Sequence, residues 1–386
     1  MLRRGGHVKK LAIIGAGRIA CDIAEDARKM GVETHCFAWP RGALAKDVVD
    51  FWYPVSIFEK ESILETCRNV GVDGVVATTE LTIAIASYIS QSMGLNGLPV
   101  SVAREITNKY RNRDLTRDLE GLRHPGYGLI RSERQIEDIG VKFPVVVKPA
   151  ARGGKRGVMV ARTRDEFASA YSYACDDGGC DEVIVEEYIE GGIECSVETL
   201  SYHGGHYLVQ VTEKESSGAP HCVELGHHQP ASLDALMREK VRSVVFAGLT
   251  RIGLTNGPCH TEIKVVGGEI YLIEFNARPG GDFISSPLVE LSTGYPYLKG
   301  AISIALDDFE GIDESMLLHR YAGVCFVTSQ TPELVPVFER CQDFDWCYRK
   351  NVVSEALLPM RHNDRQNTNY FMYCTEAGRP DFSRMV

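Results

Sequence analysis

Long apolar runs are missing from this sequence of 386 residues, and no stretch approaches the roughly 18 apolar residues that a membrane-spanning helix needs. No membrane partner is therefore expected. The basic N-terminus is followed by an apolar stretch, Leu11–Ile14, that is too short for the hydrophobic region of a signal peptide. We therefore expect a cytoplasmic protein.

Paired cysteines and clustered positive charge are also missing. The twelve cysteines form no CxxC or CxxH pair, which argues against a zinc site and favours reduced, mostly buried thiols. The net charge is −10, and no basic cluster is interleaved with aromatic residues, so nucleic acid is not an expected partner. The sequence also lacks GxxxxGKS and GxxxxGKT, which excludes a Walker-type phosphate loop.

The first third of the chain alternates strand and helix patterns. Val8–Ile14, Val32–Ala38 and Gly74–Glu80 are short β-rich or apolar runs, and helical patterns follow the first and the third of them. Such alternation predicts a parallel sheet with helices on both faces. The length of the chain predicts two to three domains, of which this α/β unit is the first.

A glycine-rich turn, Gly15–Ala20, joins the first strand to its helix in the pattern GxGxxA. Such a turn lets the backbone approach an anion at a helix N-terminus, as in dinucleotide-binding proteins. A dinucleotide site also needs an acid near the end of the second strand, and Cys36–Trp39 supplies none. An NAD(P)-dependent oxidoreductase or a nucleotide-binding module therefore stays an alternative of a different class.

A hairpin pattern with two glycines at its turn carries the sharpest signal of the chain. A two-residue turn at Gly267-Gly268 would send Glu274 to the face opposite Glu262. A three-residue turn over 267–269, or a bulge in one strand, would instead set Glu262 across from Glu274. Asn276, two residues further along the strand, would share that face.

Two facing carboxylates repel each other, and a divalent cation bound between them would remove the repulsion. Mg²⁺ typically takes one or two carboxylates together with substrate phosphates. Arg278 and the glycine turn that follows it suit a phosphate-bearing ligand. The hairpin therefore indicates a metal and phosphate site, with a solvated strand face as the alternative reading of its glutamates.

A lysine and a glycine-rich loop further upstream fit the same kind of ligand. Lys148 closes a buried strand, where its charge is costly unless an anion meets it. Gly153, Gly154 and Gly157 could lay backbone N–H groups over phosphates. An ordinary β-hairpin turn is the alternative for this loop.

Together these residues resemble the ATP-grasp superfamily, in the family's order and over nearly the whole chain. The resemblance implies that ATP is bound by Lys109, Lys148, Gly153, Gly154, Gly157, Glu186, Glu187, Tyr188, Ile189 and Glu194. It implies Mg²⁺, as two ions that Mn²⁺ can replace, on Glu262, Glu274 and Asn276, and catalytic roles for Arg278 and Lys148. The segment before Glu194 is one residue longer than the family pattern, which leaves Glu198 as the alternative ribose ligand, and Asn108 stands where the family has an acid.

The resemblance also implies an α/β (α+β) architecture with antiparallel sheets in a two-lobed ATP-grasp domain. We expect a Rossmann-like pre-ATP-grasp domain over 1–105, a small lobe or lid over 106–189, a large lobe with the metal site over 190–308, and a C-terminal subdomain over 309–386.

Within the superfamily, the segments 259–262 and 274–282 are similar to those of the L-amino acid ligases that make dipeptides, and 226–231 resembles a segment near their acceptor pocket. This implies a ligase that joins a small-molecule carboxylate and an amine through an acyl phosphate, with ADP and phosphate as products, and a homodimer. The substrate-binding candidates are Glu80, His227, His228, Arg278 and Gly281, although each histidine could be purely structural. A carboxylase that forms carboxyphosphate is the alternative on the same fold.

Overall fold

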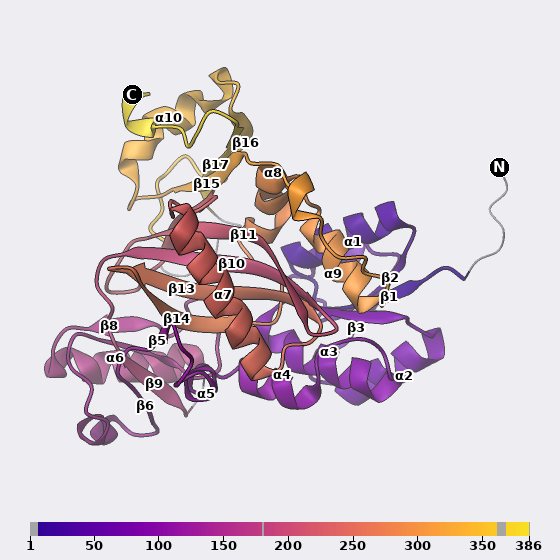
Figure 1. Ribbon diagram of the computed structural model, residues 1–386, viewed down its shortest axis with the longest axis horizontal. Coiled ribbons are helices and arrows are strands. Elements are labelled where there is room, and N and C mark those ends of the chain that lie inside the picture. Colours follow the sequence, from indigo (N-terminus) through magenta and orange to yellow (C-terminus); the bar gives the residue numbers. More distant parts are fainter. Residues whose placement is uncertain (1–6, 180, 361–367, 386) are drawn as a thin grey trace.

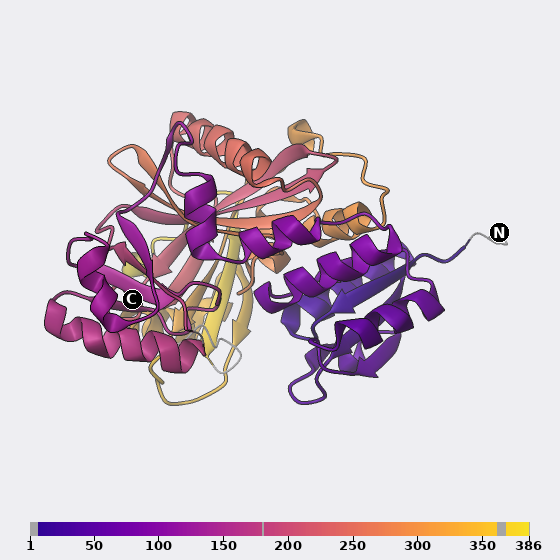
Figure 2. The ribbon, with the colours of Figure 1, turned by 90° about the horizontal axis from the view of Figure 1, so that it is seen from below.

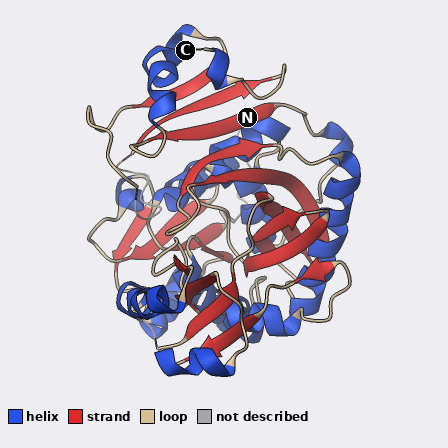
Figure 3. Cartoon of the chain, turned by 90° about the vertical axis from the view of Figure 1, so that its left-hand side faces the viewer, coloured by secondary structure: helices blue, strands red, loops and turns tan. Residues whose placement is uncertain are grey.

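The computed structural model describes residues 7–179, 181–360 and 368–385, and it contains three β-sheets (Figure 1). A four-stranded sheet is formed by the N-terminal residues, a nine-stranded sheet runs through the centre, and a second four-stranded sheet lies beside it. Most of the helices pack on the outside of these sheets (Figure 3). The mixed α/β fold with antiparallel sheets that the sequence predicts is confirmed.

The N-terminal sheet is parallel, with strand order β3-β2-β1-β4. Its strands are β1 (Lys10–Ile14), β2 (Glu33–Ala38), β3 (Phe51–Pro54) and β4 (Gly74–Ala77). Its helices are α1 (Arg18–Met30), α2 (Lys60–Val70) and α3 (Glu80–Met93), together with α9 (Tyr297–Ala305) from much later in the chain. Figure 1 shows α1 and α9 on one side of the sheet and α2 and α3 on the other, so both faces are covered as expected.

The central sheet has the order β16-β17-β15-β12-β11-β10-β13-β14-β5. Its strands are β5 (Leu122–Arg123), β10 (Ile193–Tyr202), β11 (Gly205–Ser216), β12 (Glu224–Gln229), β13 (Gly257–Val266), β14 (Glu269–Asn276), β15 (Tyr321–Val327), β16 (Cys347–Asn351) and β17 (Asn369–Thr375). The C-terminal strands β15 to β17 extend this sheet because β15 pairs with β12. Helix α7 (Ala235–Ile252) buries its apolar face against β10, β13 and β14. The other face of the central sheet is therefore free to carry polar side chains.

The second four-stranded sheet is antiparallel, with order β6-β9-β7-β8. Its strands are β6 (Tyr127–Ile130), β7 (Val145–Pro149), β8 (Met159–Ala161) and β9 (Val183–Glu187), and helix α6 (Arg164–Gly178) packs on one face. Figure 2 shows this unit and the N-terminal unit on either side of the central sheet. The shorter helices are α4 (Val100–Ile106), α5 (Lys109–Leu115), α8 (Val289–Thr293) and α10 (Val335–Arg340). No helix among the described residues is both long and apolar enough to cross a membrane.

The hairpin of β13 and β14 contains a bulge that decides where its acids lie. The turn has two residues, Gly267 and Gly268, both with positive φ, because Val266 pairs with Glu269. The three-residue turn is therefore wrong, and the alternative of a bulge is confirmed. The register shifts by one residue between positions 262 and 263 of β13, which places Glu262 directly across from Glu274.

Candidate active site

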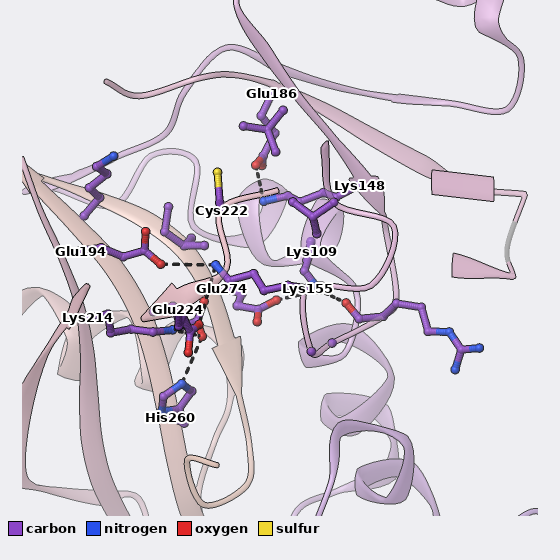
Figure 4. A pocket seen from close by; sticks show the side chains of 18 of the residues that line it. Lys109, Lys148, Lys155, Glu186, Glu194, Lys214, Cys222, Glu224, His260 and Glu274 are labelled. Atoms are coloured by element: carbon purple, nitrogen blue, oxygen red, sulfur yellow. Dashed lines mark hydrogen bonds and ion pairs between the residues drawn. The ribbon is translucent and has the colours of Figure 1, made fainter. Parts of the chain in front are cut away.

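A cavity of about 150 Å³ lies between the central sheet and the second four-stranded sheet (Figure 4). Most of the residues expected to bind ATP, metal or substrate line it. These are Lys109, Lys148, Gly153, Gly154, Glu186, Glu187, Tyr188, Ile189, Glu194, Glu262, Glu274, Arg278 and Gly281. Residues more than 150 positions apart in the chain are thus brought to one cavity by the pairing of the strands.

The floor of the cavity is the face of the central sheet that α7 does not cover. Alternate residues of β13 face the core or the cavity, so Ile263 packs under α7 while His260 and Glu262 point the other way. Across the bulge, Glu274 pairs with Glu262. Asn276 pairs with His260, and its Nδ2 donates to Glu274 Oε1 at 2.8 Å. The predicted metal ligands therefore share one face of two neighbouring strands.

Two lysines neutralise these acids. Lys109 Nζ lies 2.7 Å from Glu274 Oε2, and Lys214 Nζ lies 2.7 Å from Glu262 Oε1. Burial favours the protonated acids, but Lys214 and the neighbouring imidazole outweigh it and hold the pKa of Glu262 well below its ordinary value. Burial is likewise outweighed at Glu274, whose pKa is lowered by Lys109. Two ionised carboxylates and an amide oxygen are a donor set that suits Mg²⁺.

His260 and Lys214 are buried charged residues that the sequence analysis did not place in the site. His260 bridges two acids, with Nδ1 2.7 Å from Glu198 Oε1 and Nε2 3.2 Å from Glu262 Oε1. Burial opposes its charge, yet these carboxylates raise its pKa to about 9. Lys214 also contacts Glu224 at 2.7 Å. Lys214 is the third residue from the end of β11 and is flanked by Glu213 and Glu215, so no local signal in the sequence indicated that it would be buried.

Glu186 forms a buried ion pair with Lys148. The carboxylate of Glu186 lies 2.5 Å from Lys148 Nζ and also pairs with Nε of Arg113, whose side chain is fully buried. Burial would raise the pKa of Glu186, but these two cations lower it to about 2. Burial lowers the pKa of Lys148. The carboxylate of Glu186 raises it, but Arg113 and Lys109 act in the same direction as burial, so the pKa stays below its ordinary value. The carboxylate of Glu186, which was expected to bind ATP, is therefore engaged by two cations.

Lys155, in the glycine-rich loop 153–157, contributes its side chain to the lining of the cavity. Lys155, with φ of 59°, places its Nζ 3.3 Å from Glu194 Oε1 and 3.9 Å from Glu224 Oε1. Glu194 lines the cavity, whereas the alternative Glu198 is fully buried against His260 and does not. The geometry therefore favours Glu194 as the ribose ligand. Gly157 lies at the edge of the loop and donates its N–H to Asp177 Oδ2 at 2.7 Å.

The two histidines expected near the substrate point to opposite faces of β12. His227 lies on the cavity side of the sheet, with Nε2 3.4 Å from Glu224 Oε2. His228 faces away from it, where its Nδ1 lies 3.0 Å from the hydroxyl of Tyr373. Consecutive strand residues alternate in direction, so His228 has no path to the cavity. Glu80 and Gly281 line an adjoining second cavity, and Gly281 lines both.

Comparison with known proteins gives one family match and several whole-chain likenesses. Residues 141–287 match the family model of the ATP-grasp domain. The formate-dependent phosphoribosylglycinamide formyltransferase of Oleidesulfovibrio alaskensis is 24% identical over 290 residues, which cover 70% of this chain and 69% of that protein. Several of the side chains expected to bind nucleotide or metal lie within this range; they are Lys148, Glu186, Glu187, Glu194, Glu262, Glu274, Asn276 and Arg278.

Two solved structures share the fold over almost the full length. The L-amino acid ligase from Bacillus licheniformis superimposes with a TM-score of 0.78 and 22% identity, covering 97% of this chain and 95% of that one. The biotin carboxylase domain of the Hydrogenobacter thermophilus 2-oxoglutarate carboxylase was solved with MgADP and bicarbonate. It superimposes with a TM-score of 0.73 and 18% identity, covering 96% of this chain and 87% of that one.

Proposed function

This chain is an enzyme of the ATP-grasp superfamily, and on that premise we propose that it is an ATP- and Mg²⁺-dependent carboxylate–amine ligase. One observation carries the proposal. Glu262 and Glu274, both ionised, face each other across a bulged hairpin in the same cavity as Lys109, Lys148 and Arg278. An acidic pair surrounded by cations suits a ligand that brings both a divalent metal and phosphates.

The proposed reaction has two steps. A carboxylate oxygen of the substrate attacks the γ-phosphorus of ATP, the bond to the bridging oxygen of ADP breaks, and an acyl phosphate forms. The nitrogen of the amine then attacks the acyl carbon, phosphate leaves, and the nitrogen loses a proton to give the amide. Neither step needs a nucleophilic side chain, which fits a cavity of fixed charges.

Different residues of the cavity would bind the ligands and stabilise the charge that develops during the reaction. Lys109 and Lys148 would bind nucleotide phosphates, and Arg278 would offset the charge that develops during phosphoryl transfer. Glu262, Glu274 and Asn276 would hold two Mg²⁺ ions, or Mn²⁺ in their place. When bound, such ions supply positive charge to the phosphate oxygens.

We propose amino acids as the first substrates to test, since the sequence segments around the metal strand resemble those of L-amino acid ligases. Two further acids deserve separate arms of the same assay. Formate is named in the formyltransferase relative and bicarbonate in the solved carboxylase domain. Homodimerisation also belongs to the proposal and is checked by light scattering of the full chain.

The test is ADP release from Mg-ATP against a matrix of amino acid pairs, with formate and bicarbonate as separate arms and mass spectrometry of the products. We expect ADP and an amide in equal amounts. Bicarbonate-dependent ADP release without any amide would overturn the ligase in favour of the carboxylase. Glu274→Ala should abolish turnover while thermal unfolding stays cooperative. Glu269→Ala, a glutamate at the exposed turn of the same strand, is the matched control and should keep turnover.

A further inference from the structure

A small cavity of about 60 Å³ lies between the start of helix α7 and the segment that leads into β15. Its walls include Pro230 directly after β12, Arg238 near the start of α7, Thr293 at the end of α8 and the segment 317–321. Figure 1 shows this end of α7 close to β15 and α8. Among the described residues, none lines both this cavity and the ATP cavity, so the two are separate places in the molecule.

Arg238 is a half-buried cation on the wall of this cavity. Its guanidinium forms no hydrogen bond or ion pair with any residue that the structure describes. Burial lowers its pKa, although the carboxylate of Glu314 acts in the opposite direction. Glu314 is itself engaged by Arg242, whose Nη1 and Nη2 lie 3.4 and 3.1 Å from the two carboxylate oxygens. A charge that is withdrawn from water without a counter-ion is costly, so Arg238 favours an anion from outside the described chain.

The other ionisable groups on these walls suit the same kind of ligand. Arg320 and His319 line the cavity, and none of its described lining residues is an acid. Arg320 Nε lies 4.0 Å from Glu376 Oε1, but the side chain of Glu376 is 86% exposed, and such an exposed pair contributes little. Arg238 and Arg320 therefore repel each other within one cavity, although the net charge of the protein is −10. An anion bound there would replace this repulsion by attraction to both guanidinium groups.

Backbone hydrogen bonds fix the segment that carries Arg320. Leu318 donates its N–H to Thr293 O at 2.7 Å, and Arg320 donates its own to Ser292 O at 3.0 Å. These bonds join the segment 317–321 to the end of α8, while the arginine on the opposite wall is held by helix α7. The two cations are therefore positioned by regular structure and by backbone contacts, as a binding site requires.

The size of the cavity limits which anions fit. A buried water needs about 10–15 Å³ of such volume, so a cavity of about 60 Å³ has room for about four to six waters. A phosphate or carboxylate group is about this large, whereas a whole nucleotide is several times larger. The cavity is therefore suited to a compact oxyanion.

We propose that Arg238, Arg320 and His319 form a binding site for a compact oxyanion, which is free phosphate or the carboxylate group of a small molecule. The site lies outside the ATP cavity, so the inference goes beyond the ligase function and does not depend on it. Strand β12 connects the two places, because Glu224 at its start lines the ATP cavity and Pro230 directly after its end lines this one. A bound anion therefore contacts the chain at the far end of a strand that reaches the ATP cavity.

The first test is calorimetric titration of the full chain with inorganic phosphate and, in a separate arm, with acetate. Mg²⁺ and a non-hydrolysable ATP analogue are present at saturation, so that the phosphate positions of the ATP cavity are filled. Arg238→Gln should weaken binding of the tighter anion by about tenfold or more, as expected for a charge-assisted contact. Arg251→Gln, on the last turn of the same helix, is the matched control and should leave the affinity unchanged.

Three results of this titration would overturn the site. The first is binding of neither anion by the wild type, and the second is equal affinity in Arg238→Gln. The third is a loss of binding in Arg278→Gln but not in Arg238→Gln, which would place the anion in the ATP cavity.

Thermal unfolding distinguishes a binding role of Arg238 from a structural one. In a buffer without phosphate or carboxylate ions, Arg238→Gln should unfold at the wild-type temperature or above it, because the replacement removes a half-buried charge that has no counter-ion among the described residues. Phosphate at about 100 times its Kd for the wild type should raise the melting temperature of the wild type by a few degrees, and should leave that of the variant unchanged. An equal loss of stability of the variant with and without phosphate would make Arg238 a structural residue and overturn the site.

Discussion

Glu186 is the residue whose replacement tests the electrostatics of the site most simply. It lies between Arg113 and Lys148, and all three side chains are at least nine-tenths buried. Its pKa is lowered from 4.5 to about 2, which corresponds to about 3 kcal/mol at 1.36 kcal/mol per pKa unit. Breaking a buried ion pair typically costs about 3–5 kcal/mol, because the partner charges remain buried. Glu186→Gln should therefore destabilise the sheet of β6 to β9 by about 3 kcal/mol at neutral pH.

The sign of the pH dependence follows from the lowered pKa. The stabilisation by Glu186 is complete above its unfolded pKa of about 4.5 and is lost as pH falls through the folded value of about 2. The difference between wild type and Glu186→Gln should therefore be constant from neutral pH down to about pH 5 and should shrink below it.

Hydrogen exchange of the β7 and β9 amides, together with urea denaturation, measures this difference. A loss of about 3 kcal/mol corresponds to about 100-fold faster exchange through local opening. Glu190→Gln is the matched control, since Glu190 is 65% exposed and lies 3.6 Å from Arg162, and an exposed pair contributes less than about 1 kcal/mol. Unchanged exchange in Glu186→Gln, or a loss as large in Glu190→Gln, would refute the reasoning.

Three further predictions concern the metal strands. Lys214→Met should destabilise the protein in the absence of divalent ions by about 3 kcal/mol, since Glu262 and Glu224 stay buried without the lysine that they share, and added Mg²⁺ should recover part of the melting temperature. In the wild type, the charged imidazole of His260 contributes its full stabilisation below about pH 6.5, and this contribution is lost as pH rises through about 9. In His260→Gln the free energy of unfolding should therefore fall less steeply over this pH range. An equally steep fall in urea denaturation of the variant would contradict the prediction. Chelation of divalent ions should stop ADP release, with recovery by Mg²⁺ and by Mn²⁺ but not by Ca²⁺, whose longer bonds fit the site less well.

The hairpin shows which part of the site follows from local sequence and which does not. Both glycines of the turn predicted a hairpin, and a bulge was one of two ways to oppose its acids. Ile273 is the residue left unpaired by the bulge. It is the last of four consecutive apolar residues, 270–273, so no break in an alternating pattern marked it, and the local sequence did not decide between the longer turn and the bulge.

Pairings between distant strands could not be predicted in the same way. Lys214 meets Glu262 because β10 lies between β11 and β13, and the order of strands in a sheet is a long-range property. The extension of the central sheet by β15 to β17 is likewise invisible in the composition of those segments. For His227 and His228, by contrast, the alternation of strand residues already implied that at most one could face the substrate.

The chemistry of the first step is tested most directly by oxygen transfer. The carboxylate substrate found in the matrix is labelled with ¹⁸O at both carboxylate oxygens, the reaction is run with unlabelled Mg-ATP and amine, and the released phosphate is analysed by mass spectrometry. An acyl phosphate intermediate passes one carboxylate oxygen to the phosphate, so the account predicts phosphate with one ¹⁸O for each amide formed. Unlabelled phosphate accompanied by amide formation would contradict it.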